Sequence, residues 1–376
     1  MGIQKILIVM GGFFPGQKYG GPPVSVNNFC SLFREDECYI VTKNHDKDES
    51  VPYEGIDSGI WTKRDNCYVK YVSDESYKKS EFEKVILEIK PDVLYLQGLF
   101  QSCVLPCLEL AKQYSLKVVL APRGELCAGA FKKKYKKIPY IAYLKMKNLV
   151  RNIAYQSTSE EESAAIIKYL KADSKKIHFL TNIPSIPEKE YIHELKKSGE
   201  GKFVFVSRIH PKKNLISAIE YMKDIKGKVV FDIYGPIEDE EYWKQCKKKI
   251  HELPQNITVN YCGLVSHEKV HEIFSLYNAF LFPTFSENYG HVIAEALSVG
   301  TAVIISDQTP WSDINEAKAG WAIPLGNREE FVEAIQSVID QKPDDNQKQI
   351  KAVEKYINNK VNLEEIRREY KKAFDL

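Results

Sequence analysis

Several common functional signatures are missing from this chain of 376 residues. Its eight cysteines form no C-x-x-C pair, which argues against the usual zinc and redox motifs. No apolar run is long enough to span a bilayer, and the N-terminal MGIQKILIVMGG is too short in its apolar part for a signal peptide. Lysine and arginine total 53 against 51 acidic residues, so the overall charge does not indicate a nucleic-acid-binding surface. These absences predict a soluble cytoplasmic protein with reduced thiols.

The glycine-rich segment 11–26 lacks two nucleotide-binding patterns. Gly11 and Gly16 have the spacing of a P-loop, but Gln17 stands where lysine is required. No two of its glycines are separated by one residue, so G-x-G-x-x-G is also absent. What remains is a loop before a helix expected from about Pro23. The amides of that helix start can receive a phosphate or a sugar, and a plain glycine-rich turn explains the segment equally well.

Metal and nucleophile motifs are equally scarce. Asp46-Lys47-Asp48 matches the D-x-D pattern of metal-dependent sugar-nucleotide enzymes, but it lies in a polar run after a strand, where an exposed loop is the simpler explanation. No other group of histidines and acidic residues has metal-ligand spacing, and no G-x-S-x-G elbow is present. We therefore expect no metal ion and no resident cofactor.

Short β-rich apolar runs alternate with helical patterns almost throughout the chain. The strands are expected at 5–10, 38–42, 67–72, 92–97, 117–122, 153–158, 176–180, 203–207, 228–234, 257–262, 279–284 and 301–306. The helices are expected at 80–90, 104–114, 160–170, 215–223, 241–250, 268–277, 290–298 and 362–376. Buried strands alternating with helices specify parallel sheets covered on both faces. The charged, proline-containing stretch 183–201 separates two such α/β blocks, which predicts two Rossmann-like doubly wound domains facing a central cleft.

Two carboxylates flank a strand-to-helix junction in FPTFSENYGHVIAEAL, which begins at residue 282. Glu287 precedes the expected helix, and Gly290 lets the backbone approach a ligand closely. The amides of 290–292 are first-turn donors suited to a diphosphate, and a carboxylate can accept two sugar hydroxyls. Glu295 lies between alanines, where an unneeded charge carries a desolvation cost. The alternative is that Glu287 only stabilises the start of the helix electrostatically and that Glu295 is a solvated helix residue.

Two cations follow the first strand of the second block, in SRIHPKKN (207–214). Arg208 and Lys213 are expected at the carboxyl end of a parallel strand, where ligands bind in such folds. Two cations there can neutralise a diphosphate without a metal ion. A solvated basic loop is the alternative. The turn at Gly235, in YGPIEDEE, is expected to open on the same cleft.

Together these motifs closely resemble the signature of the GT-B-fold glycosyltransferases of family 4, the group 1 glycosyltransferases. The resemblance comprises E-x7-E from Glu287 to Glu295, the SRIHPKKNL segment, WAIPL near 321–325 and the N-terminal glycine loop. APRGEL (121–126) resembles the variant of bacterial polysaccharide and lipopolysaccharide transferases. The resemblance implies an acceptor-side domain at 1–185, with a helix at about 360–376 that can pack back onto it, and a nucleotide-sugar-binding domain at 186–359.

The resemblance also implies a reaction: retaining transfer of a sugar from a nucleotide diphosphate sugar to an acceptor hydroxyl, without a metal ion. It makes Arg208, Lys213 and Glu287 the catalytic residues, with the two cations on the leaving diphosphate and Glu287 on the donor sugar. The implied donor-binding residues are Gly20, Gly21, Arg123, Gly235, Leu264, Asn288, Gly290, His291, Val292 and Glu295. Among them, Glu295 is expected to bind the ribose and Leu264 to lie beside the base. UDP is the expected nucleotide and GDP the main rival.

Arg123 departs from the family pattern, because many members carry a histidine near this strand end. A guanidinium cannot serve as a general base, so Arg123 is interpreted as a binder of donor or acceptor, with a structural role nearly as well supported. The lysine-rich, aromatic segment 131–152 in the same domain suits either an anionic membrane surface or a solvated helix, and nucleic acid is disfavoured. A membrane surface fits a lipid-linked glycan acceptor in cell-surface polysaccharide synthesis.

Two other functions stay open. One is a GT-B sugar-nucleotide epimerase or phosphorylase. The other is a non-catalytic two-domain protein that closes on a small ligand, which the two cations disfavour because pure binding needs no neutralised leaving group.

Overall fold

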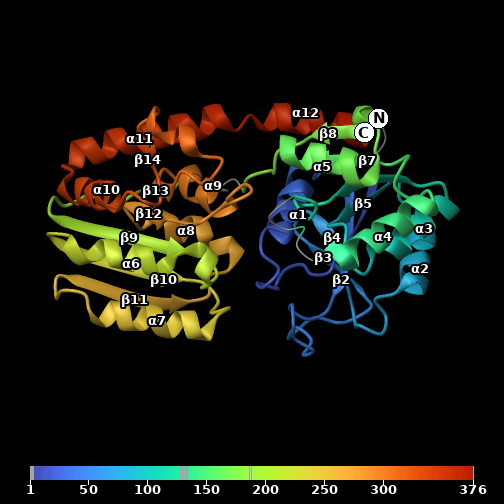
Figure 1. Ribbon diagram of the computed structural model, residues 1–376, viewed down its shortest axis with the longest axis horizontal. Helices are drawn as coiled ribbons and strands as arrows, with labels where there is room; N and C mark the ends of the chain where they lie inside the picture. The colour runs from blue at the N-terminus through green and yellow to red at the C-terminus, as the bar shows by residue number, and fades with distance from the viewer. Residues whose placement is uncertain (1–3, 128–130, 132–133, 186, 188, 376) are drawn as a thin grey trace. The chain divides into compact units, whose positions relative to one another are not determined.

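The computed structural model describes residues 4–127, 131, 134–185, 187 and 189–375. The chain forms two compact units (Figure 1). The first unit comprises Met1–Ile183 and Leu363–Leu376, and the second comprises Pro184–Asn362. The boundary thus lies after residue 183, where the sequence suggested 185, and the returning helix begins at Leu363, where it suggested about 360.

The first unit is built on a sheet that has eight strands within the described residues. In order across the sheet they are β3 (Trp61–Arg64), β4 (Cys67–Val72), β2 (Glu37–Lys43), β1 (Lys5–Val9), β5 (Val93–Gln97), β6 (Lys117–Ala121), β7 (Ala154–Ser157) and β8 (Ile177–Phe179). All pairings are parallel except that of β3 with β4. Strands β1 and β5 are buried almost completely, as expected for parallel strands covered on both faces.

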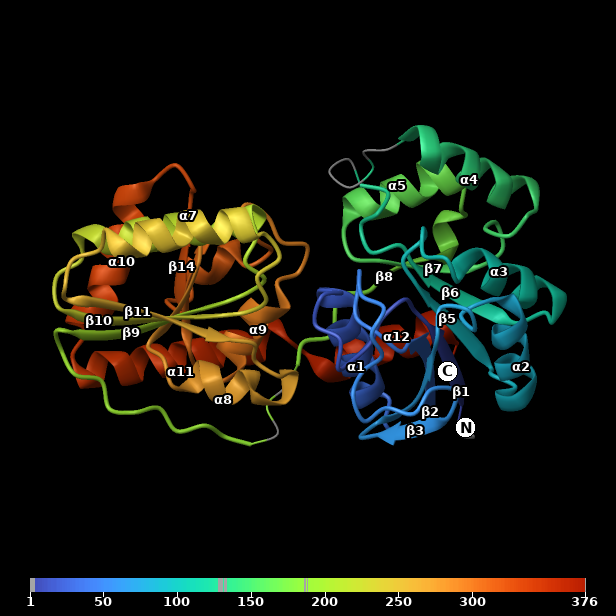
Figure 2. The same ribbon diagram turned by 90° about the horizontal axis from the view of Figure 1, so that it is seen from below.

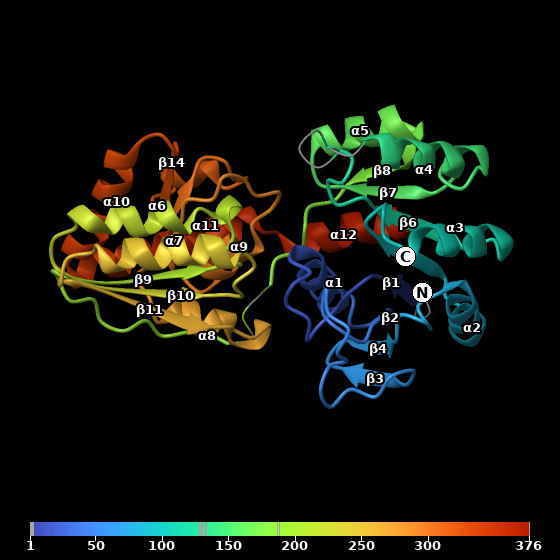
Figure 3. The ribbon, with the colours of Figure 1, turned by 60° about the horizontal axis from the view of Figure 1, so that its bottom comes forward.

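Helices cover both faces of the first sheet (Figure 3). They are α1 (Gly21–Leu32), α2 (Lys79–Ile89), α3 (Val104–Gln113), α4 (Lys134–Met146), α5 (Glu160–Leu170), the 3₁₀ turn η1 (Ser174–Lys176) and α12 (Leu363–Phe374). One core packs under α2 to α5. The other lies under α1 and α12, where Phe374 contacts the rings of Phe29 and Tyr95 at centroid distances of 5.2 and 4.9 Å. The C-terminal helix is therefore part of the first unit's core.

The second unit contains a six-stranded sheet within the described residues, and its pairings are parallel. Its strands, in order across the sheet, are β11 (Ile257–Gly263), β10 (Lys228–Tyr234), β9 (Glu200–Val206), β12 (Ala279–Phe282), β13 (Ala302–Ser306) and β14 (Gly320–Ile323). Numbered within this unit, the order is 3-2-1-4-5-6, that of a Rossmann fold. The topological switch point therefore lies between β9 and β12.

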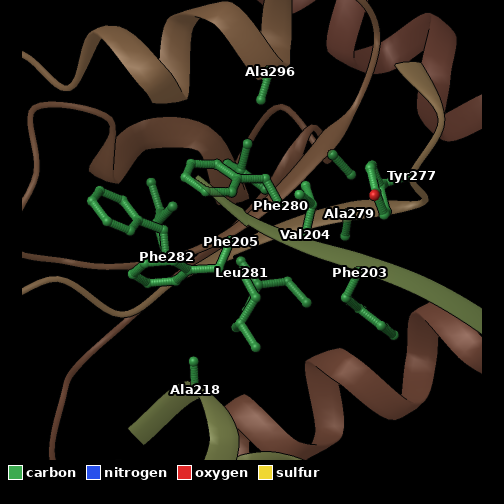
Figure 4. Close-up of a cluster of buried hydrophobic side chains, with 14 of the residues drawn as sticks. Phe203, Val204, Phe205, Ala218, Tyr277, Ala279, Phe280, Leu281, Phe282 and Ala296 are labelled. Carbon is green, nitrogen blue, oxygen red and sulfur yellow. The ribbon is translucent and has the colours of Figure 1, made fainter. Parts of the chain in front are cut away.

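Helices also cover both faces of the second sheet (Figure 2). They are α6 (Leu215–Tyr221), α7 (Glu240–His251), α8 (Val270–Ser275), α9 (His291–Ser298), α10 (Arg328–Asp340) and α11 (Pro343–Lys360). The shorter 3₁₀ turns are η2 (Pro211–Lys213), η3 (Met222–Asp224), η4 (His267–Lys269) and η5 (Ser312–Asn315). Figure 4 shows the two strands at the switch point packed between Ala218 of α6 and Ala296 of α9. This fully buried centre fixes the strand ends from which the functional loops leave.

Within the described part of the chain, every helix is too short or too polar to cross a lipid bilayer.

Candidate active site

The residues singled out in the second half of the sequence gather at the carboxyl edge of the second sheet. Arg208 and Lys213 follow β9, Gly235 follows β10, Leu264 follows β11 and Glu287 follows β12. Because the sheet is parallel, these four loops leave from one edge, and the loops after β9 and β12 border the switch point.

Lys213 and Glu287 form a largely buried ion pair at this edge. Lys213 Nζ lies 2.5 Å from Glu287 Oε1, and the two side chains are 13% and 14% exposed. Thr284 Oγ1 donates a second hydrogen bond to the same carboxylate oxygen at 3.2 Å. Burial lowers the pKa of Lys213, and the Glu287 carboxylate opposes that shift. The pair places a cation and a hydrogen-bond acceptor side by side where little water reaches them.

Main-chain contacts fasten the two loops that carry this ion pair. Asn214 Nδ2 donates to the carbonyl oxygen of Pro283 at 2.8 Å, and the amide of Phe285 donates to the carbonyl of Lys212 at 3.0 Å. Asn214 also has a positive φ of 58°, which ends η2 and lets α6 begin. The loops after β9 and β12 are thus held together by hydrogen bonds to backbone carbonyls, from one side-chain amide and one main-chain amide, independently of the charged side chains.

Arg208 lies nearby and pairs with a different glutamate. Its Nη1 donates to both carboxylate oxygens of Glu238, at 2.8 and 2.7 Å. This pair is more open to solvent than the first, with about a third of each side chain exposed. The positive charge of Arg208 also contributes to the lowered pKa of Lys213, so the two cations are close enough to repel each other.

Helix α9 begins at His291, with Gly290 as its N-cap, directly after the Glu287 loop. Gly290 has φ 78° and ψ 59°, a left-handed conformation that favours glycine, and a Cβ there would lie 2.9 Å from Ile293 Cδ1 and displace that side chain. No side chain caps the helix, and a helix supplies no acceptor of its own for the first-turn amides, here those of His291 and Val292. Asn288 lies exposed in the same loop. The helix start therefore has the geometry required for an anion.

Glu295 is buried in the second turn of α9, with 5% of its surface exposed. Burial raises its pKa from the ordinary value of 4.5 to about 7. Among the ionisable groups near it is His267 in η4, whose Nδ1 lies 3.7 Å from Glu295 Oε1. The solvated alternative for Glu295 is therefore wrong. A carboxylate kept in an apolar place at this cost fits a residue that receives a ligand.

Gly235 and Leu264 occupy the ends of β10 and β11. Gly235 has a φ of 134°, and a Cβ at this position would lie 1.9 Å from the carbonyl oxygen of Ser207. Only glycine fits between these two strand ends. Leu264 is 54% exposed, which leaves an apolar surface at the same edge for a flat ligand.

The remaining three sequence candidates lie in the first unit. Gly20, with φ 75°, precedes α1, and this helix begins at Gly21 and not at Pro23. The expectation of a row of amides there is wrong in part, because Pro22 and Pro23 in the first turn have no N–H. Arg123 is held by hydrogen bonds to neighbouring side chains, described below.

Sequence reasoning missed two side chains of the site, Glu238 and His267. Both lie in loops that follow strands of the second sheet, β10 and β11. The signal that could have found them is their position: each follows a parallel strand of the sheet whose other loops had already supplied candidates.

Comparisons with known proteins agree with this architecture. Residues 188–358, most of the second unit, match the family model "Glycosyl transferases group 1". No curated protein matches the chain. Among solved structures, sucrose-phosphate synthase from Thermosynechococcus elongatus is similar over 99% of this chain and 98% of its own, with a TM-score of 0.71 and 14% identity.

Two further solved structures have the same fold over nearly their whole lengths. HepE from Anabaena, in complex with UDP and glucose, has a TM-score of 0.71 and 13% identity, covering 99% of both chains. WaaG, a glycosyltransferase involved in lipopolysaccharide biosynthesis, has a TM-score of 0.65 and 14% identity, covering 98% of both. Residues 188–358 therefore resemble the group 1 glycosyl transferases, and the whole chain has the GT-B fold of these solved structures.

Proposed function

We propose that this enzyme transfers a sugar, with retention of configuration, from a UDP-sugar to a hydroxyl of a glycan or lipid-linked glycan in cell-surface polysaccharide synthesis. The UDP and glucose in the HepE structure and the lipopolysaccharide pathway named for WaaG support the donor and the pathway. The resemblance of the E-x7-E motif to family 4 supports retention. The proposal needs no metal ion, because the side chains of Lys213 and Arg208 can neutralise the leaving group.

The observation that carries the proposal is the buried Lys213–Glu287 pair at the switch point. When the bond from sugar to diphosphate breaks, negative charge grows on the departing phosphate oxygens. Fixed positive groups near these oxygens stabilise the transition state more than the ground state, and this difference lowers the activation barrier. Lys213 and Arg208 are assigned this role, supported by the helix start at Gly290.

The carboxylates are assigned to the sugars. Glu287 is proposed to accept hydrogen bonds from the donor sugar's hydroxyls, and Glu295 from the ribose hydroxyls. Exposed Leu264 is proposed to lie beside the base. Gly235, which has no side chain, leaves room for the neighbouring backbone at this edge of the sheet. A protein that only binds a ligand does not need cations that neutralise a leaving group. We therefore favour sugar transfer over the alternatives.

The donor is tested by thermal denaturation with UDP-, GDP- and ADP-sugars. One nucleotide is expected to raise the melting temperature in a concentration-dependent way, because a ligand that binds only the folded state stabilises it. Glu295→Gln is the matched variant, since it keeps the side chain's size and removes its charge. A wild-type protein that responds to none of the three nucleotides, or responds identically to all, would contradict the assignment.

The reaction is tested by its products. NMR of the anomeric proton of the new linkage distinguishes retention from inversion. An epimerase releases UDP and a sugar product without an acceptor, and a phosphorylase requires free phosphate. Release of UDP that depends on a glycan acceptor is the result that the proposal requires.

Membrane contact is proposed for the basic segment 131–152, part of which, residues 132–133, lies outside the described residues. Helix α4 buries Ile141 and Leu144 while leaving Tyr135 and Met146 exposed, at 72% and 73%. Exposed apolar side chains beside lysines suit an anionic bilayer surface. Flotation with anionic liposomes tests the contact: absence of binding at low salt would leave a solvated helix.

A further inference from the structure

Arg123 differs from the cations of the second unit, because no carboxylate neutralises it. It directly follows β6, in a positive-φ conformation of 56° that few non-glycine residues adopt. Arg208 and Lys213 each pair with a glutamate. For Arg123 the recorded partners are neutral, and among the described residues no carboxylate lies within ion-pair distance of its guanidinium.

Three neutral acceptors fix the orientation of this guanidinium. Its Nε donates to Gln97 Oε1 at 2.8 Å, its Nη1 to Asn182 Oδ1 at 2.7 Å and its Nη2 to the hydroxyl of Tyr95 at 3.2 Å. An arginine carries five N–H donors. One N–H on each terminal nitrogen is therefore left without an acceptor among the described residues.

A second layer of buried hydrogen bonds holds the acceptors themselves. The Tyr95 hydroxyl donates to Gln156 Oε1, and Gln156 Nε2 donates to the hydroxyl of Tyr370 at 2.7 Å. Tyr370, on α12, donates in turn to the carbonyl oxygen of Thr181 at 2.9 Å. Tyr95, Gln156 and Tyr370 are almost completely buried, so this chain of bonds ties the position of Arg123 to the C-terminal helix.

The place of Arg123 in the sheet is that of a ligand-binding residue. Gln97 ends β5, Arg123 follows β6 and Asn182 follows β8, so all three lie at the carboxyl edge of the first sheet. Arg123 is only partly buried, so its head group remains accessible. A structural arginine in such a place would normally be paired, because an uncompensated charge is costly to bury.

We propose that Arg123 is a preorganised receptor for an oxyanion of the acceptor substrate, either a phosphate or a carboxylate. Such a group accepts the two remaining N–H bonds in bidentate fashion, and neutral supports leave the full positive charge for it. That the ligand belongs to the acceptor rests on the proposed function, in which Arg208 and Lys213 of the second unit already serve the donor's diphosphate. Tyr95 and Tyr370 act as positioning residues.

The test observes Arg123 directly in the full-length protein. The chain has eight arginines, so labelling with ¹⁵N-arginine gives a short list of Nε resonances, and Arg123→Lys identifies the one that matters. Inorganic phosphate and glucuronate are titrated first without UDP and then with UDP present at saturation, and glucose is the neutral control. We expect a saturable shift of the Arg123 resonance in the millimolar range with both anions and no shift with glucose.

Positioning is tested with Tyr370→Phe, which removes one hydroxyl at the far end of the hydrogen-bond chain. The variant is expected to weaken phosphate binding at Arg123 several-fold while leaving UDP affinity unchanged. If Arg123→Lys does not fold, Tyr95→Phe identifies the resonance by perturbing it. Unchanged phosphate affinity in Tyr370→Phe would remove the positioning role.

Two outcomes would overturn the proposal. Absence of a shift with both anions would make Arg123 a purely structural residue. A shift that disappears when UDP saturates the protein would assign Arg123 to the donor. Failure of the proposed function is a separate result. UDP would then not raise the melting temperature of the protein, whether or not phosphate shifts the Arg123 resonance.

Discussion

At the scale of single residues, the two cations at the second sheet's carboxyl edge have different environments. Lys213 is largely buried, and its charge depends on Glu287 because burial alone favours the neutral amine. Arg208 is more exposed and keeps its charge in any environment. The lysine is therefore the group whose function depends more strongly on its partner.

Removing either cation is expected to slow catalysis. Arg208→Ala and Lys213→Ala should each lower kcat on the order of 10²-fold or more, the scale typical for loss of one group that stabilises a developing anion. Steady-state kinetics with the identified UDP-sugar measures this. Lys212→Ala is the matched control, because Lys212 is exposed and its recorded loop contacts are made by its backbone. Turnover close to wild type in both variants would remove the mechanism.

Neutralising Glu295 is expected to stabilise the empty protein at high pH. Its folded pKa, about 7, exceeds the ordinary 4.5, so the unfolded chain ionises first and folded stability falls as pH rises between these values. At about 1.4 kcal/mol per pH unit, the loss is roughly 3 kcal/mol above pH 7. Glu295→Gln should lack it, matching wild type near pH 4.5 in urea denaturation and exceeding it at pH 8.

The same variant is expected to bind UDP more weakly, so stability and affinity should change in opposite directions. A Glu295→Gln protein whose stability equals that of the wild type at both pH values would show that the carboxylate is not held in an apolar environment.

The motifs that carry charge could be predicted from the sequence because their spacing places them at strand ends. Arg208, Lys213 and Glu287 were singled out in this way and Glu295 by its place between alanines, and the structure brings Lys213 and Glu287 into contact. The partner of Arg208 could not be predicted, because Glu238 is separated from it by a whole strand and one acidic residue among several in IEDEE has no distinguishing pattern.

At the scale of elements, apolar runs predicted strands well where both faces are buried. Strand β4 has its predicted bounds, while β3 was missed, because this short edge strand consists of the polar sequence WTKR and is only partly buried. Strand β14 and helices α10 and α11 were also missed, although α10 has a regular buried face that includes Phe331 and Ile335. Edge elements give weaker patterns because one side faces solvent.

Because β9 and β10 approach closely at their carboxyl ends, we expect that Gly235 cannot be replaced without loss of stability. Gly235→Ala should destabilise the second unit by several kcal/mol, on the order of the cost of a strained backbone plus a steric clash, because its Cβ would lie 1.9 Å from the Ser207 carbonyl oxygen. Gly263→Ala is the control: φ is also positive, but no atom lies within 4 Å of its added Cβ. Chemical denaturation measures both, and equal effects would contradict the argument.

At the scale of the whole molecule, the chain begins and ends in the first unit. The residues themselves predicted only a charged helix at the end, since nothing local specifies which core a terminal amphipathic helix joins; that it can pack back onto the first unit was implied by the family resemblance. Its Phe374 is fully buried against Phe29 and Tyr95. Helix α12 thus completes a core made mainly by the first half of the chain.

Truncating this side chain is expected to weaken one unit selectively. Phe374→Ala should cost the first unit about 3–5 kcal/mol, the range for deleting a buried aromatic ring. Hydrogen exchange should show faster exchange in β1, β5 and α1, with little change in β9 to β14. Lys372→Ala, an exposed neighbour on the same helix, is the control. Equal acceleration in both units would show that they unfold as one cooperative body.

The glutamates beside Arg208 and Lys213 have a consequence for selectivity. Because each cation is already paired with a glutamate, this part of the second sheet's carboxyl edge carries little surplus positive charge to attract abundant cellular phosphates. In the proposed function, the donor's diphosphate competes with Glu238 for the positive charge of Arg208, so its docking exchanges counter-ions and does not fill a bare positive patch. A nucleotide sugar also makes contacts through its sugar and nucleoside, and these can compensate for the exchange of counter-ions. Orthophosphate has no such contacts and is expected to bind weakly here.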